Sequence, residues 1–176
     1  MVKLMKFFAY SLFFILALMY FMPKESIYHF AEKELQKQGV VIAHETVQER
    51  GLSLEIEHLQ VYVKSIESAT IDSVKISFFG LYNDIYAHNI VLSDAVASML
   101  PVKIASVNIN YSILHPQYIL LNAVGDFGKM QVEVDLFHRE IHAYLHAASI
   151  MQRRYRATLG NFKRIKNGEY EYVQSF

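Results

Sequence analysis

The sequence predicts a mainly β protein. We expect an N-terminal transmembrane helix and a short amphipathic helix, then a curved antiparallel sheet of about eight strands with one C-terminal helix packed on it. Two observations carry this prediction. The uncharged run from Phe7 to Met22 is far more hydrophobic than any other segment. From Val40 onward, apolar residues alternate with polar ones in runs joined by short connections, which is typical of antiparallel strands with one buried face.

The run Phe7–Met22 predicts a membrane-spanning helix. At a rise of about 1.5 Å per residue it spans roughly 24 Å, a little less than the hydrocarbon core of a bilayer. It is preceded by Lys3 and Lys6 and followed by Pro23. The side chains that we expect to contact lipid are Phe7, Phe8, Leu12, Phe13, Phe14, Ile15, Leu16, Leu18 and Phe21.

The same run also resembles a cleaved secretory signal, which is the alternative to an anchor. A cleavage site needs small residues just before the cut, whereas this chain has the bulky segment Leu18–Pro23. An uncleaved signal anchor is therefore favoured. The positive-inside rule places the basic residues 1–6 in the cytoplasm as a short tail, so that everything after the anchor at 7–22 is exported.

The exported part begins with a helix at 23–39 and continues as one β-rich domain at 40–176. Pro23 opens the helix, Gly39 ends it, and apolar side chains recur at helical spacing at Ile27, Phe30, Ala31 and Leu35. In the domain, a one-residue phase shift between Ile56 and Leu59 predicts a bulge or bend. Further alternating runs lie at Ile71–Phe78, Ile85–Leu92, Val102–Tyr111 and Tyr118–Val124.

The clearest pair of strands follows the turn Gly125-Asp126-Phe127-Gly128 and forms a hairpin around residues 137–140. Ser149 is the expected N-cap of a helix that ends at Gly160, and a last strand covers 169–176. The apolar positions of the central strands either line an open groove or are covered as an ordinary core by the C-terminal helix. These positions are Ile104, Met130, Val132, Val134, Ile141 and Leu145.

Composition and motifs exclude several function classes. Seventeen basic and seventeen acidic residues leave no net charge, which argues against a nucleic-acid partner. The absence of cysteine excludes thiol catalysis and thiolate metal sites. His138, His142 and His146 follow one another at intervals of four residues, which on a strand separates successive members by about 13 Å, too far to share one ion. We therefore predict no enzyme, and no catalytic, metal or cofactor-binding residue.

One basic cluster near the C-terminus has two interpretations. Its members are Arg153, Arg154, Arg156, Lys163, Arg164 and Lys166, with no acidic residue between them. Such a cluster is either an ordinary solvated face or a contact for anionic lipid headgroups or an acidic partner surface.

Scattered segments of the exported part resemble a known family. They are Gly51–Ile56, Ile109–Pro116, Gly125–Gly128 with Val134–Leu136, and Asn167–Tyr172. With the single anchor and short helix, they resemble protein N of the type II secretion pathway and the wider AsmA-like envelope proteins.

The resemblance implies a single-pass inner-membrane protein whose C-terminal domain lies in the periplasm. It implies a non-enzymatic accessory or assembly factor of an envelope complex, possibly type II secretion, with envelope or secretion-system proteins as partners. AsmA-like lipid binding or lipid transfer at the inner membrane is the alternative.

Overall fold

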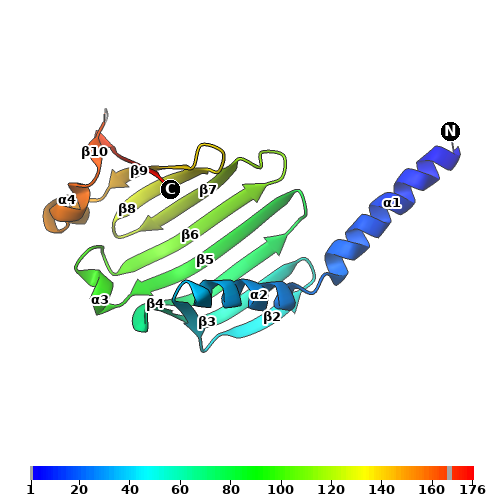
Figure 1. The fold of residues 1–176 in the computed structure, drawn as a ribbon, viewed down its shortest axis with the longest axis horizontal. Helices are drawn as coiled ribbons and strands as arrows, with labels where there is room; N and C mark the ends of the chain where they lie inside the picture. The colour runs from blue at the N-terminus through cyan, green and yellow to red at the C-terminus, as the bar shows by residue number, and fades with distance from the viewer. Residues whose placement is uncertain (1, 166–167) are drawn as a thin grey trace.

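The computed structural model describes residues 2–165 and 168–176, and one antiparallel sheet dominates its fold (Figure 1). The helices are α1 (Val2–Phe21), α2 (Lys24–Lys37), α3 (Asp94–Ala97), α4 (Ser149–Arg154) and α5 (Arg156–Leu159). The strands are β1 (Val40–Ala43), β2 (Thr46–Arg50), β3 (Ser53–Val63), β4 (Ile66–Phe78), β5 (Tyr82–Leu92), β6 (Lys103–Ser112), β7 (Tyr118–Gly125), β8 (Gly128–Asp135), β9 (Glu140–Ala147), β10 (Lys163–Arg164) and β11 (Tyr170–Ser175).

The sheet confirms the predicted mainly β, antiparallel architecture. Its strand order is β1-β3-β4-β5-β6-β7-β8-β9-β11-β10, and β2 also pairs with β3. The described residues form eleven strands rather than about eight. Two of the additional strands are short: β1 and β2 pair with different parts of β3. The third, β10, pairs with β11 through two residues only. Such short pieces lack the sustained alternation that a sequence pattern needs.

The predicted phase shift is a bend within one unbroken strand, β3. Leu54, Ile56 and Leu59 are all buried in the same cluster, although the last differs from the first two in parity. His58 between them has a left-handed φ of 59°. Strand β5, which is separated from β3 by β4, changes face in the same way near Asn89, whose φ is 52°. Irregularities of this kind increase local twist and curve a sheet.

The two helical regions that were expected after α1 differ in detail from expectation. The helix expected from Ser149 to Gly160 is two short helices, because Tyr155 leaves the helical conformation at φ −115° and ψ 37°. Ala148, not Ser149, is the N-cap of α4. On α2, the apolar stripe that includes Phe30 is exposed, and Tyr28 is the hydrophobic residue that packs on the sheet.

Helix α1 projects from one end of the molecule (Figure 1). It begins at Val2, so the residues expected to form a separate tail continue the helix. The stretch Lys3–Phe21 is long and apolar enough to cross a membrane, and none of it is buried against the rest of the chain. A core helix of a globular domain would be mostly buried, so this helix requires an apolar environment from outside the chain.

Candidate functional site

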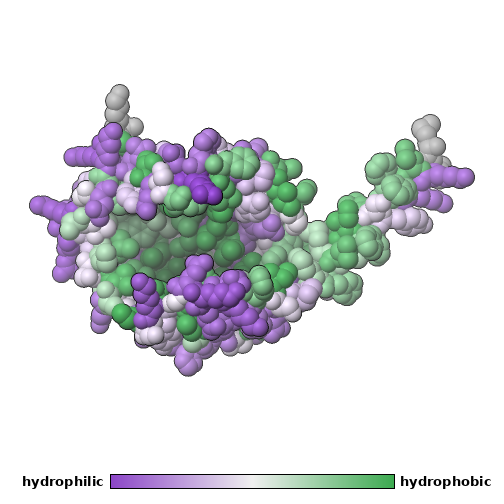
Figure 2. All heavy atoms as spheres, viewed as in Figure 1, coloured by the Kyte–Doolittle hydropathy of each residue, from purple (hydrophilic) through white to green (hydrophobic). Residues whose placement is uncertain are grey.

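The inner face of the curved sheet is a row of apolar side chains that continues from strand to strand. Leu121 of β7 pairs with Val132 of β8, which pairs with Ala143 of β9. One step along the strands, Met130 pairs with Leu145. Residues that face each other across an antiparallel ladder share one side of the sheet, so these positions form one continuous surface. Figure 2 shows it as an apolar hollow between hydrophilic rims. We call this hollow the trough.

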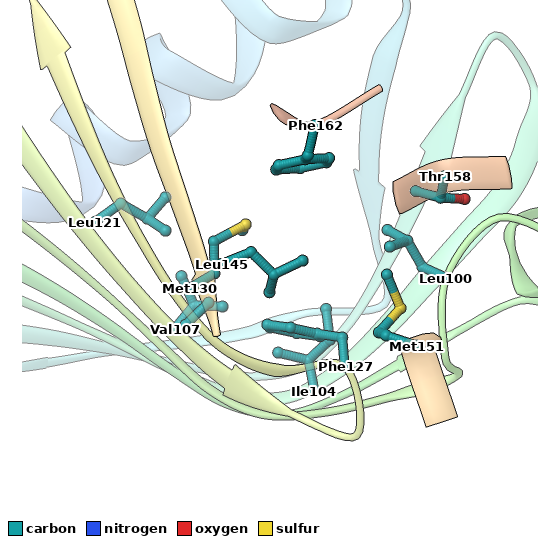
Figure 3. Close-up of a pocket in the computed structure, with 11 residues that line it drawn as sticks. Leu100, Ile104, Val107, Leu121, Phe127, Met130, Leu145, Met151, Thr158 and Phe162 are labelled. Carbon is teal, nitrogen blue, oxygen red and sulfur yellow. The ribbon is translucent and has the colours of Figure 1, made fainter. Parts of the chain in front are cut away.

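One end of the trough is a cavity of about 350 Å³ (Figure 3). Its lining is almost wholly apolar. The hydroxyl of Thr158, the one polar side chain among the described residues of the lining, already donates to the carbonyl oxygen of Met99 over 2.6 Å. The residues that line it are Leu100, Ile104, Val107, Leu121, Ala123, Phe127, Met130, Leu145, Met151, Thr158 and Phe162.

The C-terminal helices cover only this end. Met151 of α4 and Leu159 of α5 are buried in one cluster with Leu145, and Phe162 packs against that cluster from the segment after α5. In Figure 3, the ring of Phe162 lies across the cavity from Met130 and Leu145. The cavity therefore has a floor made by the sheet and a partial roof made by the C-terminal segment.

The six apolar positions predicted for the central strands fall into two sets. Ile104, Met130 and Leu145 line the roofed cavity. Val132, Val134 and Ile141 are half-buried and lie further along the same face, outside the cavity lining. The C-terminal segment thus packs over the first set, and the second set lies outside the cluster that this segment forms.

At the other end of the strand order, near β1 to β3, the sheet is covered by α2. Tyr28 of α2 packs with Leu54, Ile56 and Leu59 in a second buried cluster. The trough consequently has a closed wall on the α2 side and a partly roofed cavity on the α4 side.

The anchor residues and the basic cluster lie at opposite ends of the molecule. All nine predicted lipid-contacting side chains of α1 are exposed. The described members of the basic cluster are also exposed and lie on α4, α5 and β10, away from α1 (Figure 1). Lys166 lies outside the described residues. This placement does not favour contact between the cluster and the membrane that α1 would span, so an ordinary solvated face and a contact for an acidic partner both stay open.

The described residues contain no group of His, Cys, Asp and Glu side chains that could hold a metal ion. His142 and His146 lie on β9, whereas His138 lies in the β8–β9 turn. There Nδ1 of His138 is 2.7 Å from the carboxylate of Asp135, which also accepts the backbone N–H groups of Phe137 and His138 at 2.9 Å. Hydrogen bonds from His138 lower the pKa of Asp135, and the carboxylate raises the pKa of His138. This arrangement orders the β8–β9 turn.

Sequence reasoning missed a set of exposed apolar side chains at turns. Phe79 and Leu81 lie between β4 and β5, Ile113 and Leu114 between β6 and β7, and Phe137 between β8 and β9. Turns have no periodicity to search for. The available signal was the recurrence of large apolar residues in three alternate connections, where polar residues and Gly are usual.

Comparisons with protein-family models, curated proteins and solved structures gave no match. The function is therefore argued from the geometry of the trough and of α1.

Proposed function

We propose that this protein is a membrane-anchored, non-enzymatic envelope protein whose trough shelters the acyl chains of a lipid. The observation that supports the proposal is the cavity beside Met130 and Leu145, whose described walls are apolar except for the hydroxyl of Thr158, which is already hydrogen-bonded. A cavity of this size without convergent polar groups suits a hydrocarbon chain better than a polar substrate.

The anchor supports the same conclusion. α1 is exposed along its length and would hold the trough beside a bilayer, which is the source of such a ligand. Each methylene that leaves water contributes about 0.8 kcal/mol. In this proposal α1 crosses the inner membrane once, with the N-terminus in the cytoplasm and the domain in the periplasm. A C-terminal reporter that is active only after export tests this orientation, and a signal from the cytoplasmic side would refute it.

Lipid in the trough is tested by native mass spectrometry of the full chain purified in detergent. Val132→Trp places an indole on the inner face, and Val124→Trp on the exposed outer face of β7 is the matched control. The indole at position 132 should displace about two methylenes of the lipid chain from the trough and so weaken lipid retention roughly tenfold. Retention in Val124→Trp should be unchanged. Equal retention by both variants, or no lipid beyond the annular background in the unmodified chain, would refute the proposal.

A second candidate function is assembly of an envelope complex, in which type II secretion is one possibility. It is favoured by the outer edge of β11, where β10 pairs only with Tyr170 and Glu171. From Tyr172 to Ser175, this edge has no neighbouring strand within the part of the chain that the structure describes, so a partner strand could add there. A photocrosslinker at Val173 should recover an envelope protein, and recovery of none would count against this role.

A further inference from the structure

Five apolar side chains form a row at the turns of the sheet. They are strongly exposed, from 51% for Phe79 to 75% for Phe137. We call them the loop-tip row: Phe79, Leu81, Ile113, Leu114 and Phe137. Large apolar side chains exposed together mark a surface for a partner or a membrane, unlike single ones scattered over a surface.

The topology brings these turns to one edge. Each hairpin reverses the chain, so the turns β2–β3, β4–β5, β6–β7 and β8–β9 all lie at the same edge of the sheet. This edge is formed by the ends of the strands and not by an outermost strand. This is the edge that carries the end of α1. A Cβ atom at Gly51 would lie 3.4 Å from the ring of Tyr20, and one at Gly80 would lie 3.2 Å from the thioether of Met19. Figure 1 shows these turns along the side of the sheet toward α1.

The opposite edge has a different character. Its β3–β4 turn consists of Lys64 and Ser65, followed by the exposed Ile66 at the start of β4, and its β7–β8 turn exposes Asp126 while Phe127 is buried. Met99 is an exposed large apolar side chain in the β5–β6 connection at this edge. The apolar surface is thus concentrated at the edge near the anchor.

Charge also distinguishes a bilayer from other occupants of this edge. The three turns that carry the row, residues 79–81, 113–117 and 136–139, contain no acidic residue, and Arg139 is basic. Apolar tips on turns without carboxylates match the interfacial layer of a membrane.

We infer that the loop-tip row inserts into the interface of the bilayer that α1 spans, so that the trough opens beside the exported leaflet. This inference rests on the proposed function, because it takes α1 as an uncleaved anchor. It adds a second contact with the membrane, which would fix the tilt of the domain and keep one end of the sheet at the lipid surface.

The lack of native cysteine allows a direct test. Single cysteines replace Leu81, Leu114 or Phe137 in the full chain, and Ser98 at the opposite edge is the control. Each variant carries an environment-sensitive fluorophore and is reconstituted in vesicles of phosphatidylethanolamine and phosphatidylglycerol. Quenchers attached to lipid chains should quench the three loop-tip labels several-fold more than the Ser98 label. Equal quenching at all four positions, with full access to an aqueous quencher, would overturn the inference.

The outcomes separate this inference from the proposed function. Loop-tip labels in the bilayer together with unchanged lipid retention in Val132→Trp would uphold docking and refute the lipid-binding trough. Retained lipid together with loop-tip labels in water would refute docking alone. Labels that become shielded only when another envelope protein is added would also overturn docking, because they would identify the row as a protein interface.

Discussion

The ammonium group of Lys24 donates a hydrogen bond to the carbonyl oxygen of Tyr20 over 3.0 Å. A second bond of the same length goes to the carbonyl oxygen of Met22. The side chain is completely buried, although it carries a charge. The last carbonyl groups of a helix lack partners within the helix, and a cation is favourable at this end of the helix dipole. Lys24 therefore joins the end of α1 to the start of α2.

Replacing Lys24 with Met should loosen this junction. The loss of hydrogen bonds to a charged group should cost about 1–3 kcal/mol and free the direction of α1 relative to the sheet. Distances between spin labels at Tyr10 and Ser98 should become more broadly distributed. Lys33→Met, at an exposed position of the same helix, is the control. Equally narrow distributions in both variants would show that the junction does not depend on Lys24.

The β8–β9 turn should depend on pH through Asp135 and His138. The pKa of His138 is raised above 6.5, so its stabilising contribution is fully present below that value and is lost as the pH rises through the folded pKa. The pKa of Asp135 is lowered below 3.8, so its contribution is present above that value and is lost as the pH falls through the folded pKa. The turn should be most ordered between the two folded values.

NMR titration of His138 measures this coupling. In Asp135→Asn its pKa should return toward 6.5, because the carboxylate that raises it has been removed. Asp126→Asn, in the exposed turn before β8, is the control and should leave the titration unchanged. The same pKa of His138 in both variants would contradict the conclusion that Asp135 raises it. The turn carries Phe137, so this ion pair also orders part of the loop-tip row.

Gly128 should not tolerate a side chain. Its φ is 116°, and a Cβ atom there would lie 2.1 Å from the carbonyl oxygen of His146. Gly128→Ala should therefore lower the free energy of unfolding by more than about 3 kcal/mol. Gly168 has a φ of 79°, and no atom of the described residues lies within 4 Å of a Cβ atom there, so Gly168→Ala should cost only about 1–2 kcal/mol. Chemical unfolding compares the two variants. Equal losses of unfolding free energy would mean that the backbone around His146 moves to accommodate the added methyl group.

Tyr28 should stabilise the fold through its ring rather than its hydroxyl group. It is only 8% exposed, and its oxygen has no hydrogen-bond partner in the described part of the chain. Burial raises its pKa, and the carboxylates of Glu45 and Glu32 add to the effect, so the hydroxyl stays protonated. Tyr28→Phe should change stability by less than about 1 kcal/mol, whereas Tyr28→Ala should cost about 3–5 kcal/mol. A large loss in the first variant would reveal a hydrogen bond to the hydroxyl.

Much of the fold could be predicted from alternation. The runs around Met130 and Ile141 form a hairpin, and Gly125–Gly128 is the expected tight turn. The break at Tyr155 and the orientation of α2 could not be predicted, because both depend on packing against distant strands. Alternation at Val132 and Val134 shows that one face is apolar. It does not show whether anything covers that face.

The sequence by itself determined that α1 is apolar enough to cross a membrane and that an antiparallel sheet follows it. These features are local, since each depends on the order of side chains within one helix or strand. Only the tertiary structure decided that α4 and α5 roof one end of the trough and that Phe79, Leu114 and Phe137 lie at the edge near α1. These side chains are far apart along the chain, and they meet because each hairpin returns the strand to the same edge.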